Sequence, residues 1–401
     1  MNKKILFVIP YMHEGGAERA LSTIQAELAG AYAIETLVNT EKDRVFPNTG
    51  NVISMGIDKE ARTDSILFQF NVFIKRLRWL RKLKKQNDYY ACISFMDSAN
   101  IANILSGGKC RNIISIRISY RGKKDLPQYR FLVKPLARIL YNRADVVVAV
   151  SEELNRELEE DLKINPRKLC TITNGFDLNA IKDASKGDID SPYKEMIGDR
   201  KVILTVGRLN VMKHQWHLIR AFSLVLKQVS DVVLIVAGTG ELEPYLSKIC
   251  EELNIQDNVF LVGFVDNIYK YMKNSDVFAL TSCAEGFPNA LGEALCVGVP
   301  CVATDFKTGA REILAPNLLF DDKVIDSAIR CEYGILTPVC SGKMPIGTEP
   351  LERQESELAK ALLDLLTDDN LNKEYRSRSI ERSRSLDVKT VIDKWINVIE
   401  G

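Results

Sequence analysis

The stretch CAEGFPNALGEALCVGVP, residues 283–300, holds two glutamates with seven residues between them, Glu285 and Glu293. A glycine, a proline and an asparagine stand between these glutamates and favour a loop over a helix interior. Asn289 is a good N-cap, and the residues after it have helical composition. The sequence therefore predicts Glu285 on a loop and Glu293 one turn inside a helix whose amino end lies between them.

The amino end of this helix has the properties of an anion site. The amides of Ala290 and Leu291 would point outward there, where the helix dipole favours negative charge. An ionised carboxylate accepts hydrogen bonds from two hydroxyl groups, so Glu285 and Glu293 suit polyols on either side of the anion. That arrangement describes a nucleotide-sugar, with its ribose, its diphosphate and its sugar. The alternative is an ordinary capped helix with two solvated glutamates.

A second segment, ILTVGRLNVMKHQWHLIRAF, supplies two cations after an expected strand. Arg208 lies just past the end of that strand, and Lys213 lies at the start of the following helix. Both side chains would project from the carboxyl end of the strand, where two cations can neutralise a diphosphate. Scattered surface charge is the alternative interpretation.

A third segment, IPYMHEGGAERALSTI, follows the first expected strand. Gly15 and Gly16 permit close backbone approach, and a helix is expected over residues 17–29, which is a pattern typical of a loop near a phosphate. The segment is not G-x-G-x-x-G and lacks the Lys-Ser/Thr of a P-loop, so it disfavours a dinucleotide or nucleoside-triphosphate site. A plain strand-to-helix turn remains the alternative.

The elements that must position these residues alternate along the whole chain. Apolar runs of strand length, rich in Val and Ile, are typical of strands buried on both faces of a parallel sheet. Amphipathic stretches of helix length separate them. We predict an α/β fold of two tandem Rossmann-like domains facing across a cleft, residues 1–175 and 176–384. The polar segment 182–199 is interpreted as the interdomain linker, and a C-terminal helix over 385–401 is expected to pack back on the first domain.

Composition narrows the class of protein. With 401 residues, 46% hydrophobic and 27% charged, the chain is of the soluble globular type and long enough for two domains. A net charge of +1 gives no general attraction to nucleic acid. Nine cysteines without a C-x-x-C pair indicate reduced thiols of a cytosolic protein. The N-terminal apolar run is too short to span a bilayer and is interpreted as the first core strand.

The segment ILFQFNVFIKRLRWLRKLKKQ, residues 66–86, concentrates positive charge. Seven of the eleven residues over 75–85 are Lys or Arg, and apolar side chains recur at helical spacing. A basic amphipathic helix suits an anionic membrane surface or the pyrophosphate of a lipid-linked acceptor. A core-packed helix with a solvated basic face is the alternative. The residues predicted to make this contact are Lys75, Arg76, Arg78, Trp79, Arg81 and Lys82.

Five motifs, in order along the chain, resemble those of retaining glycosyltransferases of the GT-B architecture, the group 1 or family 4 type. The pair Glu285 and Glu293 resembles the E-x7-E motif of that family, and VGRLNVMKH resembles its Gly-Arg…Lys loop. GGAER resembles its amino-terminal glycine loop, TITNGFD resembles its hinge into the second domain, and TGAREIL resembles the Gly…Glu stretch after the second glutamate. The similarity covers essentially the whole chain.

The resemblance implies a role for each matching residue. Arg208 and Lys213 would bind the donor diphosphate and stabilise the leaving group, with Glu285 beside the donor sugar. Glu293 would hold the ribose hydroxyls. It also implies that no cofactor and no essential metal is needed, since the nucleotide-sugar is a substrate. The residues implied in donor binding, including two for the nucleobase after NVFLVGFV, are Gly15, Gly16, Phe264, Val265, Asn289, Ala290, Leu291 and Glu293.

One position departs from the family pattern, and one acidic sequence has to be assessed as a possible metal site. Many members of the family carry a histidine near the donor sugar at the end of the fourth strand of the first domain, where this chain has Arg117. Arg117 and His13 are therefore kept as contacts to the sugar or the acceptor, and a structural role for Arg117, paired to a helix carboxylate, is the alternative. The DID sequence at 188–190 lies in the polar segment rather than at a strand end, so a catalytic metal there is disfavoured.

We therefore expect a retaining hexosyl- or N-acetylhexosaminyltransferase that uses a nucleotide-sugar, UDP-linked, and a lipid-linked saccharide acceptor. It would act in bacterial cell-surface polysaccharide, lipopolysaccharide or glycoconjugate biosynthesis, in the cytoplasm and peripheral on the inner face of the plasma membrane. No nucleic-acid partner is expected. The alternatives are a sugar-nucleotide epimerase or phosphorylase on the same fold, and a catalytically dead nucleotide-sugar-binding protein.

Overall fold

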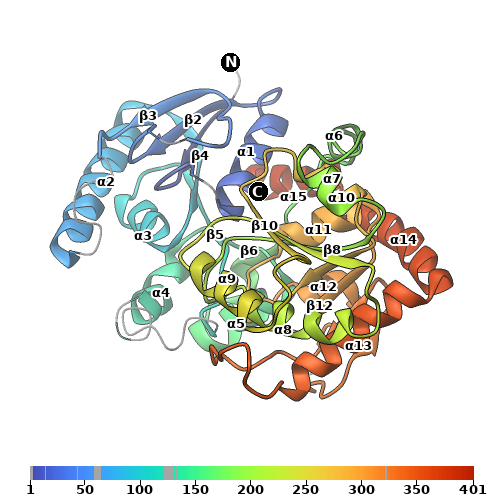
Figure 1. Cartoon of the computed structure of the whole chain (residues 1–401). Helices are drawn as coiled ribbons and strands as arrows, with labels where there is room; N and C mark the ends of the chain where they lie inside the picture. The colour runs from blue at the N-terminus through green and yellow to red at the C-terminus, as the bar shows by residue number, and fades with distance from the viewer. Residues whose placement is uncertain are drawn as a thin grey trace. The chain divides into compact units, whose positions relative to one another are not determined.

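The computed structural model describes residues 3–13, 15–42, 44–57, 65–121, 131, 133–320 and 323–401. The chain forms two compact units (Figure 1). Unit 1 comprises residues 1–175 together with the C-terminal segment 388–401, and unit 2 comprises residues 176–387. Each unit is an α/β body with its own parallel sheet, so the predicted fold class is confirmed.

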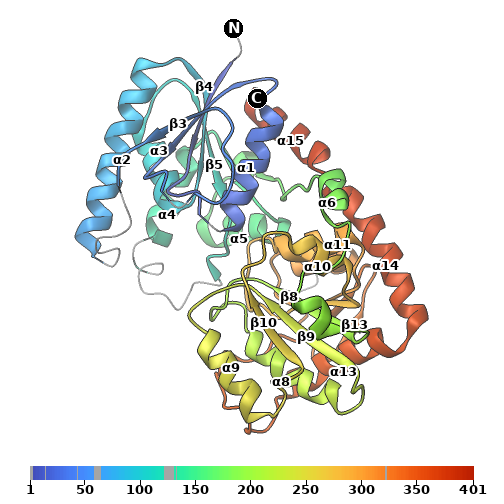
Figure 2. The ribbon, with the colours of Figure 1, turned by 45° about the horizontal axis from the view of Figure 1, so that its top comes forward.

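Unit 1 is built on a seven-stranded sheet in the order β3-β2-β1-β4-β5-β6-β7, and every pair in it is parallel. Helices cover both faces, as Val- and Ile-rich strands require. Helices α2 and α3 lie side by side on one face, and α1 packs against α15 on the other (Figure 2). The elements are β1 (Lys4–Val8), α1 (Gly16–Leu28), β2 (Ala33–Val38), β3 (Asn51–Ser54), α2 (Ile66–Gln86), β4 (Tyr89–Phe95), α3 (Asp97–Ser106), β5 (Arg111–Ile116), α4 (Lys134–Leu140), β6 (Val146–Ala149), α5 (Glu152–Leu162), β7 (Leu169–Thr171) and α15 (Val388–Glu400).

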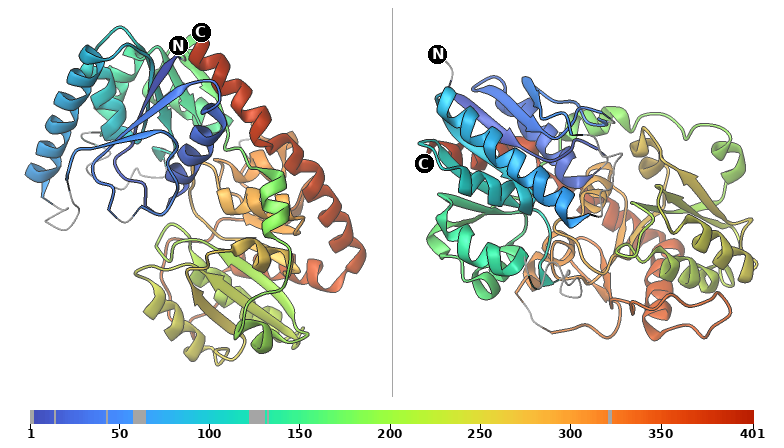
Figure 3. Two further views of the ribbon diagram at one scale, coloured as in Figure 1. Left: turned by 90° about the horizontal axis from the view of Figure 1, so that it is seen from above. Right: turned by 90° about the vertical axis from the view of Figure 1, so that its left-hand side faces the viewer.

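The last helix of the chain completes the core of unit 1. Trp395 on α15 is fully buried among side chains of β1, β4 and α1, and its ring lies 6.3 Å from that of Phe95. At the end of α15, Glu400 accepts a hydrogen bond from the Tyr32 hydroxyl at 2.6 Å and contacts the Lys3 ammonium. Figure 3 shows α15, the red helix that ends at C, beside the blue and green elements of unit 1. Residues 388–401 therefore belong to unit 1, although they follow unit 2 in the sequence.

Unit 2 repeats the architecture with the strand order β10-β9-β8-β11-β12-β14-β13. All pairs are parallel except β13 with β14, an antiparallel edge pair. Its elements are α6 (Leu178–Ala184), α7 (Tyr193–Ile197), β8 (Lys201–Val206), α8 (Gln215–Leu226), β9 (Val232–Ala237), α9 (Glu243–Glu252), β10 (Val259–Gly263), α10 (Ile268–Lys273), β11 (Val277–Leu280), α11 (Asn289–Val297), β12 (Cys301–Thr304), α12 (Ala310–Leu314), β13 (Ile329–Arg330), β14 (Ile335–Thr337), α13 (Arg353–Thr367) and α14 (Asp369–Ser383).

The predicted linker is wrong in its position. Residues 182–199 lie inside unit 2, and the chain passes between the units at 175/176 and again at 387/388. The end of α6 and the whole of α7 lie in the segment, and three isoleucines are buried, Ile181 just before it and Ile189 and Ile197 within it. Three isoleucines at spacings of eight residues are enough to hold a polar segment on the domain surface, since each buries an apolar side chain.

Candidate functional site

Two glycines, Gly207 after β8 and Gly238 after β9, determine how closely the loops at the ends of these two strands approach each other. A Cβ on Gly238, whose φ is +137°, would lie 2.1 Å from the carbonyl oxygen of Gly207, so only glycine fits there. A Cβ on Gly207 would lie 3.1 Å from the side chain of Lys213. These glycines let the loop 207–213 fold tightly over the carboxyl ends of β8 and β9, and they leave room for the lysine side chain.

Hydrogen bonds attach this loop to the loop after β11. The Thr281 hydroxyl donates to the carbonyl of Lys213 at 2.9 Å, and the amide of Cys283 donates to the carbonyl of Met212 at 3.0 Å. The side-chain amide of the buried Gln215 donates to the carbonyl of Arg208 at 3.0 Å. The segments that carry Arg208, Lys213 and Glu285 therefore form one fixed edge of unit 2. Arg208 itself is exposed.

Lys213 and Glu285, predicted from separate motifs, are in direct contact. The Lys213 ammonium meets Oε1 of Glu285, and both side chains are about four-fifths buried. The Ser282 hydroxyl donates to the same carboxylate oxygen at 2.7 Å. The Thr308 hydroxyl donates to the backbone carbonyl of Glu285 at 2.5 Å. Ser282 and Thr308 were not predicted, although Ser and Thr beside a strand end are a usable signal for such a role.

Helix α11 begins one residue earlier than predicted. Pro288, not Asn289, is its N-cap, and Asn289 is its first helical residue. The amides of Leu291 and Gly292 both donate to the Pro288 carbonyl, at 3.1 and 3.2 Å. The prediction that the Leu291 amide faces a phosphate is therefore wrong, because a backbone oxygen already accepts from it. The amide of Ala290 precedes these bonds and points out of the helix end.

The second glutamate lies inside this helix, as its spacing indicated. Glu293 is on α11 and only 2% exposed. Close packing fixes the start of the helix, because a Cβ on Gly292 would lie 2.5 Å from the ring of Phe176. A Cβ on Gly309, whose φ is +97°, would lie 2.5 Å from Pro288. The NGFD and TGAREIL motifs thus supply the partners that hold the amino end of α11.

The two residues predicted near a nucleobase follow β10. Phe264 is 52% exposed and Val265 is half-buried, directly after Gly263 with φ +68°. An exposed aromatic ring at a strand end offers a flat apolar surface for a base.

In unit 1 the loop after β1 carries the predicted glycines. Gly15 is the N-cap of α1 and Gly16 its first residue. A Cβ on Gly15 would lie 2.1 Å from a carboxylate oxygen of Glu18, which is buried in the first turn. This carboxylate was not predicted, and it places negative charge where the sequence pattern suggested a phosphate. His13 lies with its ring 5.0 Å from that of Tyr11.

Arg117 follows β5 and has no helix carboxylate as its partner among the described residues. Its Nη1 donates to Oδ1 of Asn174 at 2.6 Å, and its guanidinium lies 4.9 Å from the centre of the Phe95 ring. Burial lowers its pKa from 12.5 to about 9, because the charged form is desolvated. The structural alternative for this residue, pairing with a helix carboxylate, is therefore wrong.

Helix α2 is amphipathic, but two of its predicted contacts face inward. Arg76 is 3% exposed and donates to Asn39 Oδ1 at 2.8 Å and to Ser98 Oγ at 3.0 Å, so the prediction that it meets a membrane is wrong. Burial lowers its pKa to about 10. Trp79 packs partly against the core of unit 1, and the Lys82 ammonium lies 5.7 Å from its ring centre. The residues of α2 that are basic and exposed are Lys75, Arg78, Arg81, Lys82 and Lys85.

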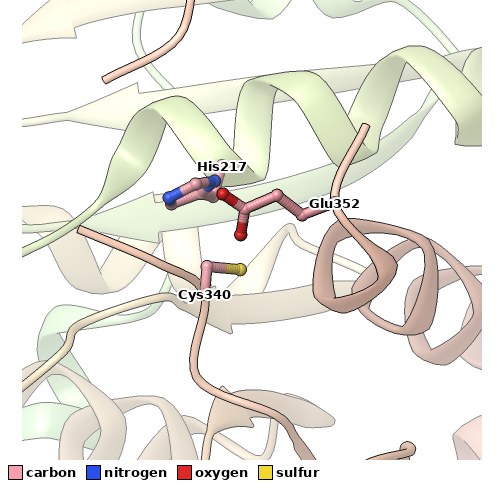
Figure 4. A group of neighbouring side chains, drawn as sticks. All are labelled: His217, Cys340 and Glu352. Atoms are coloured by element: carbon pink, nitrogen blue, oxygen red, sulfur yellow. The ribbon is translucent and has the colours of Figure 1, made fainter. Parts of the chain in front are cut away.

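One cluster has the residue types of a metal site, His217, Cys340 and Glu352 (Figure 4). Both ring nitrogens of His217 already face oxygen atoms, Glu355 Oε1 and the Ser341 carbonyl, each at 2.7 Å. Burial raises the pKa of the Cys340 thiol, which opposes the thiolate that a metal requires. Arg220 completes this network by donating to both oxygens of Glu355. The cluster anchors the loop before α13 to α8 and does not fit a metal.

Within the part of the chain that the structure describes, every helix is too short or too polar to cross a membrane.

Comparison with known proteins agrees with this geometry. Residues 15–180 match the model of "Glycosyltransferase Family 4", and residues 190–329 match that of "Glycosyl transferases group 1". An uncharacterised glycosyltransferase of Methanocaldococcus jannaschii is 34% identical over 66% of this chain and 65% of its own length. A Campylobacter jejuni enzyme is 27% identical over 96% of both chains; its name is N-acetylgalactosamine-N,N'-diacetylbacillosaminyl-diphospho-undecaprenol 4-alpha-N-acetylgalactosaminyltransferase.

Solved structures give the same fold. Anabaena HepE, solved in complex with UDP, superposes with a TM-score of 0.73 at 20% identity, covering 99% of each chain. The two sheets, the ordered motifs and both family matches therefore lead to one conclusion: the chain belongs to the GT-B glycosyltransferases, with a family 4 first half and a group 1 second half.

Proposed function

We propose that this glycosyltransferase moves a hexosyl or N-acetylhexosaminyl group from a UDP-sugar to a lipid-linked saccharide, with retention of anomeric configuration. The observation that carries the proposal is the fixed edge of unit 2, where Lys213 and Glu285 are in contact and Arg208 follows the adjacent strand. The UDP bound to HepE supports the choice of nucleotide. The diphospho-undecaprenol saccharide in the name of the Campylobacter relative supports the choice of acceptor.

The chemistry follows from the charges at this edge. When the bond from the sugar to the diphosphate breaks, negative charge develops on the β-phosphate. The ammonium of Lys213 and the guanidinium of Arg208 would stabilise that charge, together with the outward amide of Ala290. Glu285 would accept hydrogen bonds from hydroxyls of the sugar, and Glu293 from those of the ribose. These fixed positive groups are our reason to propose that no metal ion is essential.

The acceptor side of the proposal rests on α2. Two apolar side chains near its amino end, Leu67 and Phe70, are 75% and 59% exposed. The second half of the helix carries the exposed lysines and arginines. Apolar groups beside cations suit the interface of an anionic membrane. We propose that this face brings the protein to the cytoplasmic surface of the plasma membrane, where a lipid-linked acceptor of a bacterial polysaccharide or glycoconjugate pathway would be found.

A transfer assay tests the function. The purified full chain is incubated with a panel of UDP-sugars and an undecaprenyl-diphosphate saccharide, and release of UDP and mass of the product are measured. We expect UDP release that depends on the acceptor, and a product whose new linkage has the anomeric configuration of the donor by NMR. Conversion of the UDP-sugar without acceptor would favour an epimerase. Phosphate-dependent formation of a sugar 1-phosphate would favour a phosphorylase. Binding of a UDP-sugar without turnover would favour a nucleotide-sugar-binding protein without catalytic activity.

A further inference from the structure

Arg117 presents an unused hydrogen-bonding edge at the carboxyl end of β5. One nitrogen, Nη1, is held by Asn174 Oδ1 at 2.6 Å. The other two, Nε and Nη2, are buried, and neither has a hydrogen-bond partner among the described residues. The N–H groups of Nε and Nη2 point to the same side of the planar guanidinium. A group that offers two oxygen atoms in one plane would satisfy both donors at once.

Other arginines of the same chain show what this edge is used for. The Nε and Nη2 of Arg311 donate to the two carboxylate oxygens of Asp305, each at 2.6 Å. In Arg220 the same edge meets both oxygens of Glu355, and its remaining donors reach backbone carbonyls. In these two arginines of unit 2 the buried Nε–Nη2 edge is thus matched by a carboxylate. At Arg117 the Nε–Nη2 edge has none.

The partners that the described residues give to Arg117, the side-chain amide of Asn174 and the ring of Phe95, carry no charge, which favours an anion from outside the chain. Arg76, another buried guanidinium of unit 1, is likewise held by neutral groups among the described residues, Asn39 beyond the end of β2 and Ser98 on α3. The carboxylate of Asp97, at the start of α3, accepts from the hydroxyls of Tyr120 and, at 2.8 Å, of Tyr141. Desolvation disfavours an uncompensated buried cation, so an incoming oxyanion would relieve it.

We propose that the Nε–Nη2 edge of Arg117 binds an oxyanion of one of the two substrates, and that this contact selects for an acidic substrate. The inference rests on the proposed function, because it assumes that donor or acceptor reaches the carboxyl edge of the unit 1 sheet. Two sources offer the required pair of oxygens: the carboxylate of a uronic acid in the donor, and a phosphate of the lipid-linked acceptor.

The test compares binding by the full chain and by Arg117→Gln, which removes the charge and the paired donors. In the donor arm, calorimetry measures UDP, UDP-glucose and UDP-glucuronic acid. In the acceptor arm, it measures a short-chain prenyl diphosphate saccharide. We expect one arm to depend on Arg117 by about tenfold or more, the scale of one charge-assisted paired contact. UDP affinity should be unchanged, since its phosphates are assigned to the cations of unit 2.

Each outcome has one meaning. If UDP-glucuronic acid binds more tightly than UDP-glucose and Arg117→Gln abolishes the difference, the oxyanion is a donor carboxylate. If only the prenyl diphosphate binds more weakly to the variant, the oxyanion is an acceptor phosphate. If UDP binds but neither arm responds, the inference is overturned while the proposed function stands; failure to bind any UDP-sugar would overturn both. Should Arg117→Gln not fold, Arg117→Lys keeps the charge without the planar edge, and the same loss of the bidentate contact is expected.

Discussion

The ammonium of Lys213 and the carboxylate of Glu285 are in contact, although they come from motifs more than seventy residues apart. The pair is only partly exposed, and Ser282 holds the same carboxylate oxygen. If Lys213 binds the donor phosphate, as we propose, the carboxylate that touches it would lie close to the anomeric centre of the donor. We infer that this pair marks the point where the sugar–phosphate bond breaks.

The first prediction concerns the cations of this edge. Lys213→Ala and Arg208→Ala should each lower turnover by about a hundredfold or more, because each removes a charge that stabilises the leaving diphosphate. Turnover is measured as acceptor-dependent UDP release, with thermal unfolding as the check on folding. Lys248→Ala is the matched control, because Lys248 is exposed on α9 and its ion pair with Glu252 is long, at 3.7 Å. Near-normal turnover in both cation variants, with intact folding, would refute the assignment.

The second prediction concerns metal. If the fixed cations and the Ala290 amide neutralise the leaving diphosphate, activity should persist in excess chelator after extensive dialysis. Acceptor-dependent UDP release is measured with and without chelator, and the metal content of the protein is measured in parallel. Complete loss of activity that magnesium or manganese restores would show that the proposal of metal independence is wrong.

The third prediction concerns pH and His214. This histidine is the N-cap of α8 with φ +51°, and burial lowers its pKa from 6.5 to about 4. The unfolded chain therefore binds a proton between pH 6.5 and 4 that the folded chain excludes, so this group destabilises the fold as the pH falls through that window. The slope is at most about 1.4 kcal/mol per pH unit.

The measurement is chemical unfolding at a series of pH values for the unmodified protein and for His214→Asn. Asparagine tolerates the left-handed conformation and does not titrate. Other acidic groups titrate equally in both proteins, so the difference in unfolding free energy isolates His214. We expect that difference to shift in favour of the variant by up to about 3 kcal/mol between pH 7 and pH 4. A difference independent of pH would contradict the lowered pKa.

The sequence predicted the fold well because its signal is local. Each apolar run became a strand of the expected parallel sheet, since Val- and Ile-rich segments between amphipathic helices have few other ways to bury both faces. The antiparallel β13 was missed, because Ile329–Arg330 is too short to stand out. The linker was misplaced, because the buried residues that hold 182–199 on unit 2 are scattered isoleucines, Ile181 before the segment and Ile189 and Ile197 in it, rather than a continuous apolar face.

Site residues whose positions depend on spacing along the chain could be predicted from the sequence. Those whose orientation depends on side-chain packing could not. Seven residues between the glutamates suffice to place Glu285 before α11 and Glu293 within it. The inward turn of Arg76 was not readable from charge alone, because its partners Asn39 and Ser98 come from distant loops. The same holds for the one-residue shift of the α11 cap, which depends on Pro288 packing near Gly309.

The fourth prediction concerns the exposed basic residues of α2. Charge reversal of Arg78, Arg81 and Lys82 to Glu should release the protein from anionic vesicles, since each basic residue near such a surface contributes about 1 kcal/mol. Salt should weaken the vesicle binding of the unmodified protein as well, because it screens the attraction and leaves the apolar contribution. The measurement is co-sedimentation with vesicles of stated anionic content, beside vesicles of neutral lipid.

A matched control separates this helix from net charge. Reversal of three exposed lysines of unit 2, Lys182, Lys227 and Lys360, changes the total charge equally, and vesicle binding should survive it. Replacement of the exposed Leu67 and Phe70 by serine should weaken binding at high salt, where the apolar contribution dominates. UDP-sugar affinity should be unchanged in all of these variants, since α2 belongs to unit 1 and the diphosphate is assigned to unit 2.

If the variant with reversed charges on α2 still sediments fully with vesicles, as the control variant does, α2 does not dock on the membrane and its basic face is only solvated. A fall in UDP-sugar affinity together with a lower unfolding temperature would instead mark a damaged fold, and single reversals at Arg78 and Lys82 would then replace the triple variant.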